Sequence, residues 1–142
     1  MPVVDANVII DLVAPDVAVG GPAERLIAGL AAERFEILVP ALVWIESSNA
    51  LLTGIRRGRW DGEAADGAFA ALAGIPVVSA DTQEDWERAF ELARRYDNWP
   101  VYDMVYVALA ERLGTEFYTA DEKLRGRLAH LPWVLGLSAG AG

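Results

Sequence analysis

The sequence predicts a single α/β domain in which helices cover both faces of a parallel sheet. Short β-favouring runs alternate with longer helical patterns along the chain. Such alternation favours parallel strands joined by right-handed crossovers. The 142 residues are 54% hydrophobic and 23% charged, which is typical of a compact domain with one core. We therefore expect one domain over residues 1–142, with a frayed tail of small residues at 138–142.

Four short runs rich in β-branched and aromatic residues are the expected strands, because such residues favour extended backbone. They cover residues 3–4, 37–39, 77–78 and 117–118. Each is followed by a longer pattern with helical periodicity. The expected helices cover residues 6–13, 22–34, 41–57, 62–73, 82–96, 101–113 and 122–128. Pro40 and Pro100 stand where the beginnings of two of these helices tolerate proline.

The apolar stretches are too short to cross a membrane. The longest, 37–45 and 101–110, fall well short of the roughly 20 residues that a membrane helix needs. The N-terminal residues lack a basic region before an apolar core, and Asp5 and Asp11 interrupt any signal sequence. The absence of cysteine excludes disulfides and thiolate metal sites. We therefore expect a cytoplasmic protein.

The chain is strongly acidic, with a net charge of −9 and a pI of about 4.5. This charge predicts repulsion from nucleic acids unless positive charge is local or supplied by a metal. The densest basic group is Arg56, Arg57 and Arg59. It fits either a solvated helix end, where cations suit the C-terminal dipole, or a set of phosphate contacts.

Asp5 stands at the end of the first expected strand, between residues that look buried. Parallel sheets bind ligands beyond the carboxyl ends of their strands, so an acid at this position is a candidate functional residue. Asp5 also fits an N-cap for the helix expected over 6–13. Asn7 is placed to orient its carboxylate.

Glu46 lies in a short polar patch within a strongly apolar helical pattern. Glu46 and Asn49 are three residues apart and share a helix face. A buried carboxylate needs a cation or hydrogen-bond donors nearby, because it is otherwise costly or protonated. The alternative is an exposed glutamate on the outer face of the helix.

Asp103 is the only charged residue between positions 101 and 110. A helix this apolar is mostly buried. Asp103 falls in its first turn, where free N–H groups and the helix dipole favour an anion. That local effect is an alternative explanation for the aspartate.

Asp121 follows the last expected strand and precedes a helix, so it fits either a functional acid or an N-cap. Asp81 has the same local form, with Thr82 and Glu84 or Asp85 as capping partners. The physical arguments do not choose between Asp81 and Asp121.

Three or four carboxylates within a few ångströms of one another need a hard divalent cation, because they repel one another unless protonated. Magnesium or manganese suits oxygen ligands. Such a metal lowers the pKa of a bound water and screens a phosphodiester, which suits hydrolysis. It would also let an acidic protein act on RNA.

Other chemistries lack essential parts. His130 is the only histidine, which makes a histidine-dependent triad a poor fit. The chain has no Gly-rich phosphate loop ending in Gly-Lys-Ser or Gly-Lys-Thr. A receiver that accepts a phosphoryl group needs a lysine on a late strand, yet the only lysine, Lys123, falls on an expected helix.

The acids resemble, in order and spacing, those of PIN-domain ribonucleases, especially the toxin component of VapBC toxin–antitoxin systems. Val-Val-Asp-Ala-Asn at positions 3–7 is similar to the family's opening strand with its first acid. The segment from Glu46 to Leu52 is similar to the second-acid helix, and the segment from Tyr102 to Gly114 to the third-acid helix. Thr-Ala-Asp at positions 119–121 resembles the final motif, which favours Asp121 over Asp81.

The resemblance spans nearly the whole chain and implies a three-layer α/β/α PIN-like (Rossmann-like) fold with a central parallel sheet of four or five strands. It implies an endoribonuclease that hydrolyses RNA with one or two magnesium or manganese ions. It also implies a homodimer and inhibition by a cognate VapB-type antitoxin. A PIN-domain nuclease in RNA processing or DNA cleavage, without a toxin role, is the alternative. The implied catalytic and metal-binding residues are Asp5, Glu46, Asp103 and Asp121, supported by hydrogen bonds from Asn7, Asn49 and Thr119.

Overall fold

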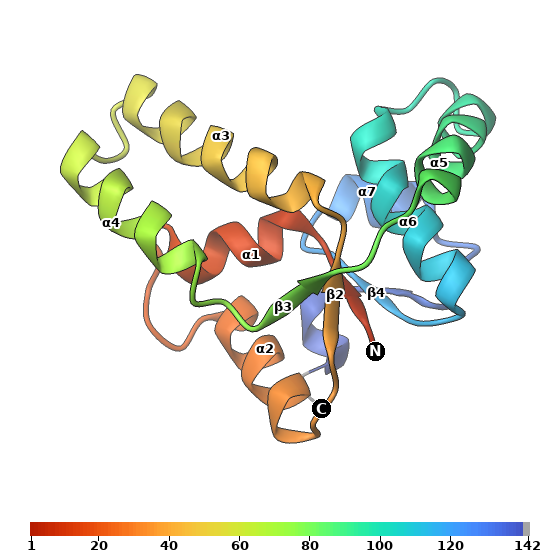
Figure 1. Ribbon diagram of the computed structural model, residues 1–142, viewed down its shortest axis with the longest axis horizontal. Coiled ribbons are helices and arrows are strands. Elements are labelled where there is room, and N and C mark those ends of the chain that lie inside the picture. Colours follow the sequence, from red (N-terminus) through yellow and green to blue (C-terminus); the bar gives the residue numbers. More distant parts are fainter. Residues whose placement is uncertain (141–142) are drawn as a thin grey trace.

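The computed structural model describes residues 1–140 and contains a five-stranded, all-parallel sheet with helices around it (Figure 1). The strand order is β3-β2-β1-β4-β5. The strands are β1 (Val3–Val4), β2 (Ile37–Val39), β3 (Val77–Ser79), β4 (Phe117–Tyr118) and β5 (Val134–Leu135). The helices are α1 (Ala6–Val13), α2 (Pro22–Ala32), α3 (Leu42–Arg56), α4 (Gly62–Leu72), α5 (Gln83–Arg95), α6 (Val101–Leu113) and α7 (Glu122–Arg127), followed by a 3₁₀ helix, η1 (Leu137–Gly140).

The predicted α/β class and parallel sheet are confirmed. All four expected strands are present, and β5 is the fifth. β5 was not among the expected strands because it is only two half-buried residues long and no helical pattern follows it. Its place in the sheet depends on tertiary contacts, in which the Phe117 and Thr119 N–H groups donate to the carbonyls of Trp133 and Leu135.

Several helices end one or two residues earlier than the sequence predicts. The helix expected over 22–34 ends at Ala32, because Arg34 has a φ of 61°, in the left-handed region that a right-handed helix excludes. The left-handed backbone of Gly114, with a φ of 62°, ends α6 in the same way. Residues 138–140 of the expected frayed tail belong to η1, and residues 141–142 lie outside the part of the chain that the structure describes.

The core lies around β1, the central strand of the sheet. Both residues of β1 are completely buried. The helix α6 packs on β1 and β4, and α5 packs on the outside of α6. Every residue of α6 from Met104 to Ala110 is buried, which explains why this segment is apolar on all sides. The sheet therefore holds α6, and with it Asp103, against the carboxyl end of β1.

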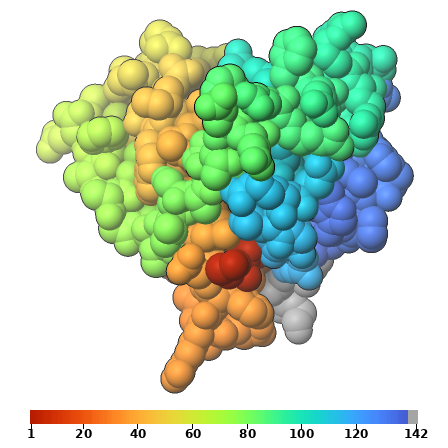
Figure 2. Space-filling model, turned by 45° about the vertical axis from the view of Figure 1, so that its right-hand side comes forward, coloured from red at the N-terminus to blue at the C-terminus, as the bar shows by residue number. Residues whose placement is uncertain are grey.

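α3 and α4 lie side by side and project from one side of the sheet (Figure 1). In Figure 2 the N-terminal end lies at the surface between the orange segment that contains α2 and the blue segment that contains α6. No helix within residues 1–140 is long and apolar enough to span a membrane.

Candidate active site

Asp5 lies directly after β1, is only 5% exposed and caps the N-terminus of α1. One oxygen, Oδ1, accepts a hydrogen bond from the Ala6 N–H at 2.7 Å. The other, Oδ2, accepts one from the Thr119 hydroxyl at 2.7 Å. The cap and the functional interpretation of Asp5 are therefore compatible, since the capped carboxylate also lies at the carboxyl end of the central strand.

Asn7 and Thr119 tie the ends of β1 and β4 together. The Asn7 amide donates to the Thr119 hydroxyl at 3.3 Å and lies 3.5 Å from Asp5 Oδ2. Its oxygen accepts from the Ala120 N–H at 3.2 Å. Thr119 is completely buried, and its hydroxyl accepts from the Asp121 N–H at 3.0 Å. These contacts hold Asp5 and the start of α7 in one network, although a catalytic role for the residues stays a prediction.

Glu46 is half-buried on α3 and is held by a residue from α6. The Tyr106 hydroxyl donates to Glu46 Oε1 at 2.7 Å, and the Tyr106 side chain is completely buried. The exposed-glutamate alternative for Glu46 is therefore wrong. Asn49 is exposed, and the side-chain hydrogen bonds within residues 1–140 do not include one from Asn49, so its support of the site stays a prediction.

Asp103 lies in the first turn of α6 and is half-buried. The indole N–H of Trp99, just before the helix, donates to Asp103 Oδ2 at 2.7 Å. Burial raises the pKa of the Asp103 carboxyl, the Trp99 hydrogen bond opposes that rise, and the charge of Asp121 adds to it. The charge of Asp121 therefore acts on Asp103 in addition to the effect of its first-turn position in α6.

Asp121 and Asp81 occupy different places in the sheet. Asp121 follows β4, next to the central strand, and its Oδ1 caps α7 by accepting from the Leu124 N–H at 3.0 Å. Asp81 follows β3 at the sheet edge, and its Oδ1 accepts from the Ala41 N–H at 2.8 Å, just before α3. Asp81 thus serves the start of α3, whereas Asp121 is close enough to raise the pKa of Asp103.

The acids at the carboxyl end of the sheet act on one another electrostatically. Burial is the main cause that raises the pKa of Asp5, to about 7, and the charges of Asp103 and Glu46 add to the rise. Burial and the charge of Asp103 also raise the pKa of Glu46, against the hydrogen bond from Tyr106. The structure therefore brings Asp5, Glu46, Asp103 and Asp121 into one electrostatically coupled group.

A metal ion fits the chemistry of this group, although its side chains do not form a finished coordination shell. Within residues 1–140, no three histidine or acidic side chains are close enough together to hold a metal ion as they stand. In each of Glu46, Asp103 and Asp121, one carboxylate oxygen accepts a protein hydrogen bond and the other accepts none within the described residues. Each acid is therefore anchored by one oxygen and keeps a hard oxygen ligand for a divalent cation.

The arginines with possible RNA contacts lie at the far end of α3. Arg56 is ten residues beyond Glu46, which corresponds to about 15 Å along a helix axis. The Arg56 guanidinium donates to the Thr53 hydroxyl. The Arg59 side chain makes a two-pronged ion pair with Asp16 and lies 4.7 Å from the centre of the Trp60 ring. Arg57 follows the last residue of α3, and an RNA contact by any of the three stays a prediction.

Tyr106 and Trp99 are site residues that sequence reasoning did not identify. Their rings fit the apolar pattern of a core, and only the folded chain shows that both polar groups point at acids. Burial and the neighbouring charges of Glu46, Asp5 and Asp103 raise the pKa of Tyr106, so its hydroxyl stays protonated and remains a donor. An aromatic residue with a polar group, placed one helical turn from an acid, is the signal that could have indicated this role.

The family model for the PIN domain matches residues 3–127 of the chain. The match includes all of β1 to β4 and all four acids. PIN domains are typically metal-dependent nucleases, so the match indicates a nuclease of the hydrolase class. With most of its length matched and the parallel sheet in place, the chain belongs to the PIN domain family.

Proposed function

We propose that the protein is a metal-dependent endoribonuclease toxin of a type II toxin–antitoxin system, of the VapC type. The observation that carries the nuclease proposal is the group of acids at the carboxyl end of the sheet, in which Asp103 and Glu46 raise the pKa of Asp5, Asp103 raises that of Glu46, and Asp121 raises that of Asp103. Carboxylates arranged at this cost suit a site that receives a divalent cation.

Each acid has a distinct task in this proposal. Glu46, Asp103 and Asp121 would bind one or two magnesium or manganese ions through the oxygens that accept no hydrogen bond from residues 1–140. Asp5, fixed by Thr119 and by the Ala6 N–H, would complete the ligand set. The bound metal would supply a water of lowered pKa and would screen the charge of the RNA phosphodiester.

Cleavage of RNA by the purified protein tests this proposal. The wild type should cleave single-stranded RNA in magnesium or manganese and should lose activity in EDTA. Asp103→Asn removes a ligand charge but keeps the shape of the side chain, so activity should fall by at least about 100-fold, which corresponds to about 2.7 kcal/mol of barrier. Asp81→Asn is the matched control, because Asp81 follows a strand of the same sheet but its carboxylate accepts from the Ala41 N–H, just before α3. Equal activity in the wild type and Asp103→Asn would refute the proposal.

The toxin role rests on the resemblance to VapC proteins, and a nuclease for RNA processing or DNA cleavage is the alternative. A toxin acts on cytoplasmic RNA and is held in check by a small VapB-type antitoxin. Expression of the wild type should therefore arrest growth, and co-expression of a small protein from the neighbouring gene should restore it. Harmless expression of an RNA-cleaving wild type would favour the alternative.

We also propose a homodimer. Trp86, Phe90 and Tyr102 are more than half exposed and lie close together on α5 and α6. Burying these side chains against a second copy of the chain would remove their apolar surface from water, which favours association. Sedimentation of the wild type should give a dimer, and Phe90→Glu should give a monomer. A wild type that stays monomeric at high micromolar concentration would refute this part of the proposal.

A further inference from the structure

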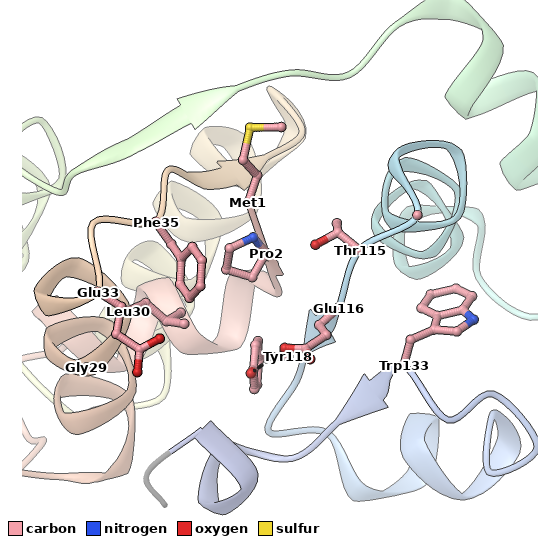
Figure 3. A pocket seen from close by; sticks show the side chains of 11 residues that line it. Met1, Pro2, Gly29, Leu30, Glu33, Phe35, Thr115, Glu116, Tyr118 and Trp133 are labelled. Carbon is pink, nitrogen blue, oxygen red and sulfur yellow. Dashed lines mark hydrogen bonds between the residues drawn. The ribbon is translucent and has the colours of Figure 1, made fainter.

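A second site lies at the opposite end of the sheet from the acids. Its cavity of about 590 Å³ is formed where the chain enters four neighbouring strands (Figure 3). Pro2 precedes β1, Phe35 precedes β2, Glu116 precedes β4 and Trp133 precedes β5. We call this cavity the edge pocket. The proposed nuclease chemistry uses none of these side chains.

Two carboxylates line the edge pocket. Glu33 comes from the end of α2 and Glu116 from the loop before β4, and neither takes part in an ion pair within residues 1–140. The Tyr118 hydroxyl donates to Glu116 Oε2 at 2.7 Å. Burial, this hydrogen bond and the charges of Glu116 and Glu33 raise the pKa of Tyr118 to about 12. The charges of both carboxylates therefore raise the pKa of the same side chain, Tyr118, at the wall of the pocket.

The C-termini of two helices add to the negative charge that Glu33 and Glu116 bring to the pocket. Gly29 and Leu30 belong to the last turn of α2, and Gly114 and Thr115 directly follow α6. The C-terminus of a helix carries a partial negative charge and favours a cation within its last turn. The pocket therefore repels anions such as phosphate.

Aromatic rings complete the lining. Phe35 is 46% exposed, although an isolated phenylalanine is usually better buried. Figure 3 shows Phe35, Tyr118, Glu33 and Glu116 gathered around the pocket, with Trp133 farther along it. Aromatic faces attract cations, most strongly when the cation is also desolvated.

We propose that the edge pocket binds a guanidinium group, as carried by an arginine side chain of a protein partner. A guanidinium is planar, stacks on aromatic rings and offers a fork of donors that matches carboxylates. It satisfies the unpaired charges of Glu33 and Glu116 and covers the exposed ring of Phe35 at once. An ammonium group would pair with the acids but would not stack, and a neutral apolar group would leave the carboxylates unpaired.

Isothermal titration of the metal-free full chain with N-acetyl-arginine amide tests the proposal, because this probe presents arginine as a protein chain does. Saturable binding should occur, and N-acetyl-citrulline amide, which has the same shape without the charge, should bind at least tenfold more weakly. N-acetyl-lysine amide should bind at least threefold more weakly than the arginine probe. Glu116→Gln and Glu33→Gln should each weaken arginine binding at least fivefold.

Glu63→Gln is the matched control, since it removes the same charge from an exposed position in the first turn of α4 and should leave binding unchanged. Thermal melting establishes that each variant is folded. Equal binding of the arginine and citrulline probes, equal binding of the lysine probe, or unchanged binding in both pocket variants would overturn the assignment. Because the titration needs neither metal nor RNA, its outcome is independent of the proposed nuclease.

Discussion

Replacing Asp5 with asparagine should stabilise the metal-free protein at neutral and higher pH. Asp5 is almost completely buried, and its folded-state pKa of about 7 lies well above the ordinary value of 3.8. Asparagine keeps the shape of the side chain and an oxygen for the Ala6 N–H. The variant therefore removes a buried charge and leaves the N-cap of α1 in place.

The size and pH range of the effect follow from the two pKa values. Above pH 3.8 the unfolded state loses the Asp5 proton, whereas the folded state keeps it until about pH 7. The unfolded state thus binds fewer protons in this range, and the free energy of unfolding of the wild type falls as the pH rises. At about 1.4 kcal/mol per pKa unit, the Asp5 carboxyl lowers the free energy of unfolding of the wild type by up to about 4 kcal/mol at pH 8 and by less than about 1 kcal/mol at pH 4.

Urea unfolding of both proteins in EDTA at pH 4, 6 and 8 measures this difference. The free energy of unfolding of Asp5→Asn should exceed that of the wild type by an amount that grows steadily from pH 4 to pH 8. An advantage that is the same at all three pH values would mean that asparagine acts by packing or hydrogen bonding. A variant that is less stable than the wild type at pH 8 would refute the argument that a buried, repelled charge lies at this position.

Two further substitutions test contacts that position the site. Tyr106→Phe removes the donor to Glu46, so the pKa of the Glu46 carboxyl in a carbon-13 NMR titration should rise, since this hydrogen bond favours the ionised carboxylate and lowers its pKa in the wild type. Gly54→Ala should destabilise the protein in urea by about 1–3 kcal/mol, because the added Cβ would lie 2.0 Å from the Trp60 ring.

Each of these substitutions has a clear contrary outcome. An unchanged pKa of Glu46 in Tyr106→Phe would show that the tyrosine does not hold this carboxylate. Gly67→Ala is the control for Gly54, because Gly67 lies within α4 with open space around its Cβ position. It should stabilise the chain by about 0.5–1 kcal/mol. Equal effects at both glycines would exclude a clash with Trp60.

Periodicity and β-favouring runs predict most of the fold, because the helices and four strands carry their own local signals. β5 does not, since two half-buried residues acquire strand geometry only by pairing with β4. The end of α2 is set by a single residue with left-handed backbone, Arg34, which the side-chain pattern does not reveal.

The candidate site is predictable in its acids but less so in its supports. Asp103 stands out because a charge within a buried helix needs an explanation, and Asp5 because it ends a strand. The hydrogen bonds from Tyr106 and Trp99 connect residues that look like core, whereas Asn49 faces solvent and its support of the site stays a prediction. The choice between Asp121 and Asp81 needs the strand order, which places Asp121 beside β1 and Asp81 at the sheet edge.

The central claim is that the coupled acids form a site for a divalent cation, and direct titration with manganese tests it. The wild type at pH 8 should bind Mn²⁺ saturably, and Asp103→Asn should weaken that binding at least tenfold. Asp81→Asn should bind as the wild type does, because Asp81 follows β3 at the sheet edge and its carboxylate accepts from the Ala41 N–H. Equal binding by the wild type and Asp103→Asn, or no saturable binding by the wild type, would contradict the claim.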